Sequence, residues 1–407
     1  MFLSRHILTA AAINFKMINI FRILIALSIF ITALSQPTET LAAAQGALGS
    51  WWRNVVPALL PFFILTEFLS RTGLIQALSI WLGPVMQPLF RLPGAAALGI
   101  CLGFFAGSPT GGAIAGQLRQ QGLLSRNEGE RLLAFCNNAG PLYIMLTVTA
   151  ALGQPEIGVW LALAHYPLNL LWGLLLRFWA GKNATETNAS YTTARQLLAA
   201  GWQAALGRNR PNQPLSLLLK ESSLKALTNI GMIGAFMLIF SLLLLSLSHF
   251  GVLKLLQLAL LPLCRLLNLP SSVLPALADG CFEMTLGIDA LAACSAPLSA
   301  KLLTASIILA WSGLSIHCQI AGVLADSDLS LRYYLPCRLL HVLAAPALLL
   351  FCQNHGWLSL NSGWFAQTGP AVPDWLLLPG ALLLPGLFSL GFLLAISFSL
   401  AGRRTQG

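Results

Sequence analysis

Long runs of apolar residues, separated by short polar segments, occupy most of this sequence. Eight of the runs approach the twenty or so residues that an α-helix needs to cross a bilayer. They are Ile18–Ser35, Val55–Ser70, Leu132–Leu152, Ile157–Ala180, Leu227–Ser248, Leu302–Leu324, Leu335–Cys352 and Trp375–Leu400. The pattern therefore predicts an all-α, polytopic membrane protein with about eight transmembrane helices.

Two further apolar runs are broken in the middle by Gly, Pro, Ser or Asp. Pro93–Leu118 is centred on GFFAGSPTGG, and Pro270–Cys294 is centred on DGCFEMTLG. Glycine frees the backbone, and Pro109 disfavours helix at the residue before it. Each arm has about ten residues, roughly half a bilayer at 1.5 Å per residue. Both runs are predicted to be re-entrant hairpins, because non-helical backbone at that depth is tolerated only within protein or along a cavity.

The two halves of the chain repeat the same order of elements. Leu74–Phe90 and Val252–Leu267 contain prolines and polar residues and are predicted as surface helices, one ahead of each hairpin. A helix broken in the middle follows each hairpin, with Asn138-Ala139-Gly140-Pro141 in the first break and Trp311-Ser312-Gly313 in the second. Each half would cross the membrane an odd number of times, which inverts the second half. The order predicts two inverted repeats, as in many secondary transporters.

The predicted boundaries divide the chain into five parts. They are an N-terminal transmembrane anchor with an outer loop (1–52), a first repeat (53–180), a cytoplasmic linker (181–222), a second repeat (223–352), and an outer loop with a C-terminal transmembrane helix (353–407). The polar stretch Gly181–Leu215 is expected to be a flexible loop. The first apolar run leaves two alternatives open, a retained helix, which we favour, or a signal peptide cleaved near Leu41–Ala44.

Composition and charge agree with a membrane protein and indicate its orientation. Hydrophobic residues make up 57% of the chain and charged residues only 9%, whereas soluble domains have about 25% charged residues. Of the 23 Lys and Arg, all but Arg53, Lys254, Arg265 and Lys301 fall on the side of the N-terminus when eight crossings are counted. Because basic loops stay inside, we expect a multi-pass protein of the inner (plasma) membrane with both termini cytoplasmic.

The broken elements also supply the candidate chemistry. Unwound segments free backbone groups at mid-depth, where helix N-termini attract anionic or polar groups and carbonyl ends attract cations. Two hairpin tips and two broken helices, brought together by the repeat, would line one central site for a small polar solute. The candidate lining residues are Gly107, Ser108, Pro109, Thr110, Gly111, Asn137, Asn138, Gly140, Asp279, Glu283, Thr285, Ser312, Gly313, Ser315, His317 and Gln319.

Several of these residues have a structural alternative. A charge at the bilayer centre costs about 2.5–3.5 kcal/mol on insertion scales, so Glu283 is expected either to bind a solute or ion or to satisfy a polar helix end. Asn137 and Asn138 would either bind solute or satisfy the break beside them. A single intramembrane histidine such as His317 is more often packed and hydrogen-bonded than functional.

The sequence has no signature of an enzyme, a cofactor or a metal site. It contains no GxSxG in context, no HExxH and no P-loop. Its 8 cysteines form no CxxC pair and no Cys/His cluster. We expect no enzymatic activity, no cofactor, no metal and no nucleic-acid partner. The expected partners are the lipid bilayer and an unidentified small polar solute, with or without a coupling ion, and an oligomer is left open.

Five sequence blocks in order resemble the YlbJ-type sporulation integral membrane proteins. They are SWW-x-x-VVPALLPFFIL-x-E (from Ser50), GFFAGSPTGGAIAGQLR (from Gly103), EGERLLAFCNNAGPLYI (from Glu128), FEMTLG (from Phe282) and AWSGLSIHCQIAGVL (from Ala310). Such proteins belong to the nucleoside-recognition, or Gate, group, which is similar to concentrative nucleoside transporters. The resemblance implies a Gate fold, with hairpins and unwound helices around a solute site. It leaves the solute undefined, because the first hairpin reads Gly-Ser-Pro-Thr-Gly-Gly and not the Gln-Thr-Glu type of nucleoside carriers.

These observations leave two main hypotheses for function. The first is a transporter that moves or binds a small polar solute by alternating access. The second is a non-transporting membrane protein of spore or envelope assembly that retains the Gate fold. A subunit of a larger channel is a weaker third hypothesis. A hydrated cavity that touches both hairpin tips would favour the first hypothesis over the second.

Overall fold

The computed structural model describes residues 19–20, 22–180, 193–206 and 214–357, and the regular structure of this part of the chain is entirely helical. A first helix, Arg22–Ser35, precedes the labelled ones. The others are α2 (Pro37–Ser50), η1 (Trp51–Val55), α3 (Val56–Arg71), α4 (Leu74–Phe90), α5 (Ala96–Ala106), α6 (Thr110–Gln120), α7 (Arg126–Cys136), η2 (Tyr143–Val148), α8 (Thr149–Leu152), α9 (Pro155–Leu176), η3 (Arg177–Trp179), α10 (Ala194–Leu206), α11 (Leu215–His249), α12 (Val252–Leu266), η4 (Ser271–Val273), α13 (Leu274–Phe282), α14 (Met284–Ala293), α15 (Leu298–Trp311), α16 (Gly313–Val323) and α17 (Tyr334–Asn354). The all-α, polytopic membrane class predicted from the sequence is confirmed.

Four helical segments in the described part are long and apolar enough to cross a membrane. They are Pro155–Trp179, Leu215–His249, Leu298–Val323 and Tyr334–Asn354. A fifth span results if Arg22–Ser35 and the helix after it are counted as one, although they meet at a bend of 114°. The predicted span Trp375–Leu400 lies outside the described residues, so the count of eight crossings stays a prediction.

The two predicted breaks interrupt helices at the expected positions. The first separates α7 from η2, because the chain is extended at Asn137 and a proline follows Gly140. The second separates α15 from α16, where Ser312 has a left-handed backbone. The predicted surface helices are α4, with the expected bounds, and α12, which ends one residue earlier than expected.

Two segments expected to be loops are helical instead. Residues 37–50, expected in an outer loop, form α2, which begins with Pro37 and is rich in alanine and leucine. Residues 194–206 of the expected flexible linker form α10. Trp81 of α4 contacts Trp202 of α10 edge-to-face, with ring centroids 5.5 Å apart. Packing against α4 therefore stabilises α10. The mean polarity of the linker sequence gave no sign of this helix.

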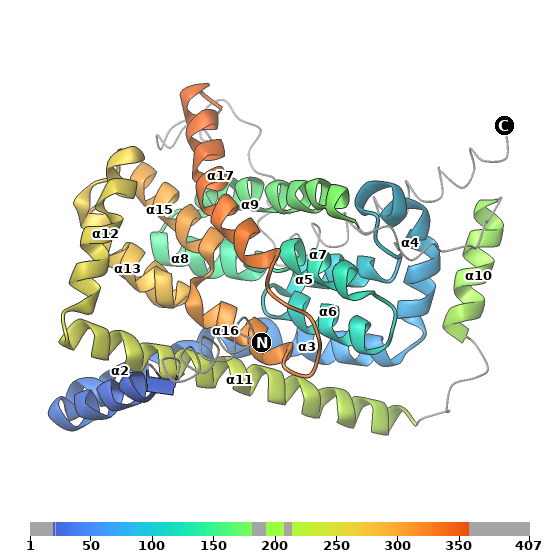
Figure 1. Cartoon of the computed structure of the whole chain (residues 1–407), viewed down its shortest axis with the longest axis horizontal. Helices are drawn as coiled ribbons and strands as arrows, with labels where there is room; N and C mark the ends of the chain where they lie inside the picture. Colours follow the sequence, from blue (N-terminus) through green and yellow to red (C-terminus); the bar gives the residue numbers. More distant parts are fainter. Residues whose placement is uncertain (1–18, 21, 181–192, 207–213, 358–407) are drawn as a thin grey trace, which may run out of the picture.

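Two hydrophobic cores hold the bundle together, and each takes residues from both halves of the chain. The first contains residues of α4–α7 with Ile316 and Ile320 of α16. The second contains residues of α13–α15 with Ile144 and Val148 of η2. The chain thus passes from one core to the other at each break. Figure 1 shows α11 running along one side of the bundle across both halves, where it packs against α3, α12 and α16.

Candidate functional site

The first half brings a hairpin turn against a helix break. Helices α5 and α6 pack together, and the turn between them contains Gly107 and Ser108. The Ser108 amide donates to the carbonyl oxygen of Asn138 at 2.8 Å. Gly107 has φ +78°, and a Cβ there would lie 2.7 Å from the Gly140 nitrogen. Only glycine allows this approach, so the hairpin tip and the break form one backbone-to-backbone contact.

Asn137 fixes the same contact from the side of the broken helix. Its Oδ1 accepts from the Gly112 amide at 2.8 Å, and its Nδ2 donates to the Leu133 carbonyl at 2.9 Å. The side chain is fully buried. It therefore satisfies an amide near the N-terminus of α6 and a carbonyl near the C-terminus of α7, groups that helix ends leave free.

The second half repeats this arrangement with different residues. Glu283 caps α14, and its Oε2 accepts from the Leu286 amide at 2.7 Å. Gly313 has φ +79°, and a Cβ there would lie 3.0 Å from the Met284 nitrogen. The indole of Trp311 donates to the Cys281 carbonyl at 2.9 Å. Here the glycine that permits the contact belongs to the broken helix instead of the hairpin.

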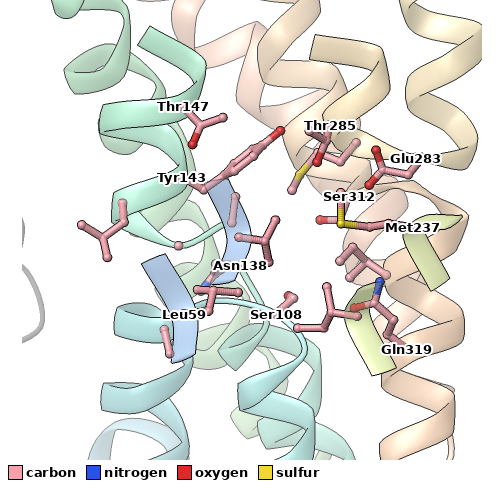
Figure 2. Close-up of a pocket in the computed structure, with 18 of the residues that line it drawn as sticks. Leu59, Ser108, Asn138, Tyr143, Thr147, Met237, Glu283, Thr285, Ser312 and Gln319 are labelled. Carbon is pink, nitrogen blue, oxygen red and sulfur yellow. The ribbon is translucent and has the colours of Figure 1, made fainter. Parts of the chain in front are cut away.

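A pocket lies where the two hairpin turns and the two breaks meet, closed on one side by α3 and α11 (Figure 2). Its volume is about 80 Å³, room for roughly six water molecules. It is lined by Val55, Leu59, Phe105, Ala106, Ser108, Asn138, Ala139, Gly140, Leu142, Tyr143, Thr147, Ile233, Met237, Glu283, Met284, Thr285, Ser312, Ile316 and Gln319. We call this the central pocket.

Polar atoms around the central pocket lack protein partners. Ser108 Oγ, Asn138 Oδ1 and Gln319 Oε1 are buried and accept or donate no hydrogen bond among the described residues. Figure 2 shows the Tyr143 ring reaching across the pocket toward Thr285. Buried polar groups without a partner are rare in folded proteins and costly. Their presence at one pocket indicates that it holds water or a polar solute.

A second, larger pocket adjoins the first. Its volume is about 310 Å³, and Ile233 and Gln319 line both pockets. Its other lining residues are Phe63, Glu67, Pro109, Thr110, Ala113, Ile114, Gln117, Gln120, Lys225, Asn229, Met232, Gly322, Val323 and Asp326. Lys225 and Asp326 are exposed, so this pocket, which we call the outer chamber, reaches the protein surface.

The structure brings together part of the predicted site. Ser108, Asn138, Gly140, Glu283, Thr285, Ser312 and Gln319 line the central pocket, and Pro109 and Thr110 line the outer chamber. Gly107, Gly111, Asn137, Asp279, Gly313, Ser315 and His317 line neither pocket.

Some of the residues outside both pockets have clear structural contacts. His317 pairs through Nδ1 with the Tyr334 hydroxyl at 3.1 Å, and its ring packs edge-on against Trp311. Ser315 accepts from Gln319 Nε2 at 3.1 Å. A Cβ on Gly111 would lie 2.4 Å from the Cys136 carbonyl oxygen. These residues position the walls of the pocket instead of facing it.

Two groups of pocket residues were not predicted from the sequence. Tyr143 and Thr147 follow the first break on η2, and their short distance from Pro141 is a signal that could have found them. Ile233 and Met237 of α11 form an apolar wall with residues of α3. An apolar residue within an apolar helix carries no local signal, so only the packing of α11 across both halves identifies this wall.

A buried polar network lies behind the first core, between α9 and α17. Arg338 is 1% exposed and donates to Asn169 Oδ1. Trp172 donates to His341 Nδ1 at 3.1 Å, and His341 Nε2 lies 2.9 Å from His165 Nδ1. Since His341 Nδ1 accepts, its Nε2 carries the hydrogen and donates to His165. The network joins two predicted spans but lines neither pocket.

Charged contacts at one end of the molecule tie the loop after α16 to the first half. Arg119 donates to both Asp328 oxygens, at 2.8 and 2.9 Å, and this pair holds the pKa of Asp328 below its ordinary value. Glu130 is 1% exposed and accepts from the Ser330 amide and hydroxyl, at 3.1 and 2.7 Å. The loop lies beside the outer chamber, whose lining includes Asp326.

A search of the described residues finds no group of three or more His, Cys, Asp or Glu side chains placed to hold a metal ion. The cysteines of this part of the chain are all unpaired thiols.

Comparison with known proteins gives two matches in sequence. The model of the Gate family, described as nucleoside recognition, matches residues 52–154. The sporulation integral membrane protein YlbJ of Bacillus subtilis (strain 168) is 32% identical over 368 residues, which cover 84% of this chain and 90% of that protein. No solved structure matches. The Gate match covers α3 to α8, which include the first hairpin and the first break.

Proposed function

The chain belongs to the family of the sporulation integral membrane protein YlbJ, and from this premise we propose that it binds a small polar solute in the central pocket and moves it across the inner membrane by alternating access. The observation that carries the proposal is the set of unpartnered polar atoms around this pocket. Buried polar atoms without a partner are uncommon in folded proteins, and several of them gather at this one pocket. A solute with its own donors and acceptors would satisfy them.

The packing of the helices supports the two inverted repeats that this proposal needs. Within the first half, α5 packs on α6 and both pack on α7; within the second half, α13 packs on α14 and both pack on α15. Between the halves, α16 packs on α6 as α8 packs on α14, and α17 packs on α7 as α15 packs on α9. Each contact has a counterpart under exchange of the halves. In this proposal α5–α6 and α13–α14 are the re-entrant hairpins.

Alternating access would act on the contacts between the halves. Each break contributes free helix ends to the central pocket, and each hairpin tip packs on the break of its own half. A rocking motion of one half against the other would keep these contacts within a half and change those between α6 and α16 and between α8 and α14. The site would then open to one side at a time, as in other repeat-based carriers.

The test is a ligand screen on the full-length protein reconstituted in nanodiscs, with nucleosides, amino acids and inorganic ions as probes. Binding is measured as the rise in thermal unfolding temperature, and uptake into proteoliposomes is measured for the compounds that bind. Ser108→Ala should remove most of the rise, because Ser108 lines the central pocket. Ser306→Ala is the matched control, since its hydroxyl is also buried without a partner but lines neither pocket.

Binding without uptake would favour the alternative, a non-transporting protein of spore or envelope assembly that retains the Gate fold. The name of the Bacillus subtilis relative supports this alternative. So does the small volume of the central pocket, about 80 Å³, whereas ligand sites commonly measure about 300–1,000 Å³. If no probe raises the unfolding temperature of the wild type and Ser108→Ala matches Ser306→Ala in stability, the solute site is wrong.

A further inference from the structure

The two pockets carry acidic charge although the whole chain is basic. The net charge of the chain is +10. Among the residues that line the pockets, however, the carboxylates are Glu283, Glu67 and Asp326, and the only basic side chain is Lys225. A route lined by one sign of charge enriches solutes of the opposite sign and repels those of the same sign. The path into the site therefore disfavours anions.

The arginines near the outer chamber do not reverse this sign. Arg119 is held by both oxygens of Asp328, and Arg71 is paired with Glu221. Neither arginine lines a pocket. Each pair is close to neutral as a unit. Lys225 and Arg71 also act on Glu67, so Glu283 and Asp326 carry the excess of carboxyl groups in the pocket walls.

Glu283 supplies the one carboxyl group of the central pocket. Its side chain is 3% exposed, and no Lys, Arg or His of the described residues lies within ion-pair distance of it. The Leu286 amide donates to the carboxylate, and the amide and hydroxyl of Thr285 also hydrogen-bond to it, but none of these donors carries a charge. A buried carboxylate without a cationic partner is strongly disfavoured. The chain supplies no such partner here, and a bound solute would.

The unpartnered polar atoms of the remaining lining can all accept hydrogen bonds, and the pocket has one apolar wall. Asn138 Nδ2 donates to the Phe135 carbonyl at 3.4 Å, so its Oδ1 is the unpartnered atom and can only accept. Ile233 and Met237 of α11 add apolar surface to the same pocket. The pocket thus combines a carboxyl group and acceptor atoms with an apolar wall.

We infer that the solute of the central pocket is a small organic cation, with an ammonium group that donates to Glu283 and a short body that lies against Ile233 and Met237. The inference rests on the proposed solute site and adds its charge class. The pocket volume of about 80 Å³ limits the solute to a few heavy atoms, or requires the pocket to widen on binding.

The experiment compares three probes of nearly equal size and different charge. They are 3-aminopropanol, 1,3-propanediol and 3-hydroxypropanoate, at neutral pH, with the full-length protein in nanodiscs and empty nanodiscs as the blank. Binding is measured by saturation-transfer NMR titration. We expect the amine to bind about tenfold more tightly than the diol, because a hydrogen bond to a charged group is stronger than a neutral one. The carboxylate should bind more weakly than both.

Three variants identify the group responsible. Glu283→Gln should reduce the affinity for the amine to that for the diol and leave the diol unchanged. Glu39→Gln is the matched control: it makes the same chemical change at an exposed carboxylate on α2, outside both pockets, and should change nothing. If Glu283→Gln does not fold, Gln319→Glu gives the second test. It adds a carboxylate to the pocket wall and should increase the preference for the amine.

Other outcomes overturn the inference in distinguishable ways. Equal or tighter binding of 3-hydroxypropanoate, or an amine preference that survives Glu283→Gln, would refute the charge class and leave a neutral solute site standing. Loss of amine binding in sodium but not in potassium buffer would assign the carboxylate to an inorganic cation. No binding of any probe above the blank would remove the solute site itself, and the inference with it.

Discussion

Gly107 shows how a single backbone position sets the geometry of the central pocket. Its φ is +78° and its ψ is −172°, a combination that is essentially restricted to glycine. A methyl group there would also lie 2.7 Å from the nitrogen of Gly140. The position of a Cβ is fixed by the backbone that carries it, and the nitrogen belongs to the backbone of Gly140, so neither atom can move without displacing the hairpin tip or the break.

Gly107→Ala should therefore lower the free energy of unfolding by more than the strain of about 1–3 kcal/mol for such a conformation alone. Gly122→Ala is the matched control, because Gly122 has φ +70° but nothing lies within 4 Å of a Cβ there. It should cost about 1 kcal/mol. The stability losses of the two variants are compared through their unfolding temperatures in nanodiscs. Equal losses for the two variants would mean that the close approach to Gly140 contributes nothing.

Arg338 is a buried cation that has no carboxylate within ion-pair distance among the described residues. Arg338 donates to Asn169 Oδ1 from 1% exposure. Asn169→Leu should destabilise the protein by about 3 kcal/mol, because it leaves a buried charge without its acceptor. Replacing Arg338 by Met in the same protein should recover a large part of the loss, since the unmatched charge is gone. A double variant whose loss equals the sum of the two single losses would show that the residues are uncoupled.

At the scale of elements, the contacts that hold the loop between α16 and α17 to the first half include two of unequal strength. Glu130→Gln should destabilise this contact by about 2 kcal/mol, because a buried carboxylate that accepts from Ser330 is replaced by a group that presents donors to other donors. Asp328→Asn should have little effect, because its pair with Arg119 is exposed and screened by solvent. Hydrogen exchange of the amides from Ser327 to Arg332 distinguishes the two. Faster exchange in Asp328→Asn than in Glu130→Gln would reverse this ranking.

The elements predicted correctly from the sequence are those marked by residue types within the element itself. Gly, Pro and Asn within apolar runs placed both breaks, and prolines with polar residues placed α4 and α12, because backbone freedom and a missing amide act at the residue itself. Helix α10 was missed because its stability depends on contacts such as Trp81 with Trp202, far apart in sequence. The apolar wall of the central pocket was missed for the same reason, since Ile233 and Met237 are distinguished only by what packs against α11.

For the whole molecule, the two adjoining pockets and the charge distribution together predict from which side the site is reached. The outer chamber opens at the end that carries Lys225, Asp326 and the pair Arg119–Asp328. Because basic loops stay inside, the excess of Lys and Arg predicts that this end faces the cytoplasm. In the conformation described, the central pocket adjoins the outer chamber through Ile233 and Gln319, so water and solute should enter from the cytoplasmic side.

The measurement is the reaction of single cysteines with a membrane-impermeant thiol reagent, in a background with all 8 native cysteines replaced. Asn229→Cys, in the outer chamber, should react fast when the reagent is added from the cytoplasmic side and slowly from the other. Lys254→Cys is the control, since it is exposed on α12 and predicted to be outside, and its sidedness should be opposite. Ser108→Cys should react with the same sidedness as Asn229→Cys but more slowly, because Gln319 and Ile233 stand between the two pockets. Faster labelling of Ser108→Cys from the side on which Lys254→Cys reacts would mean that the site opens away from the outer chamber, and the direction of access derived from this structure would have to be reversed.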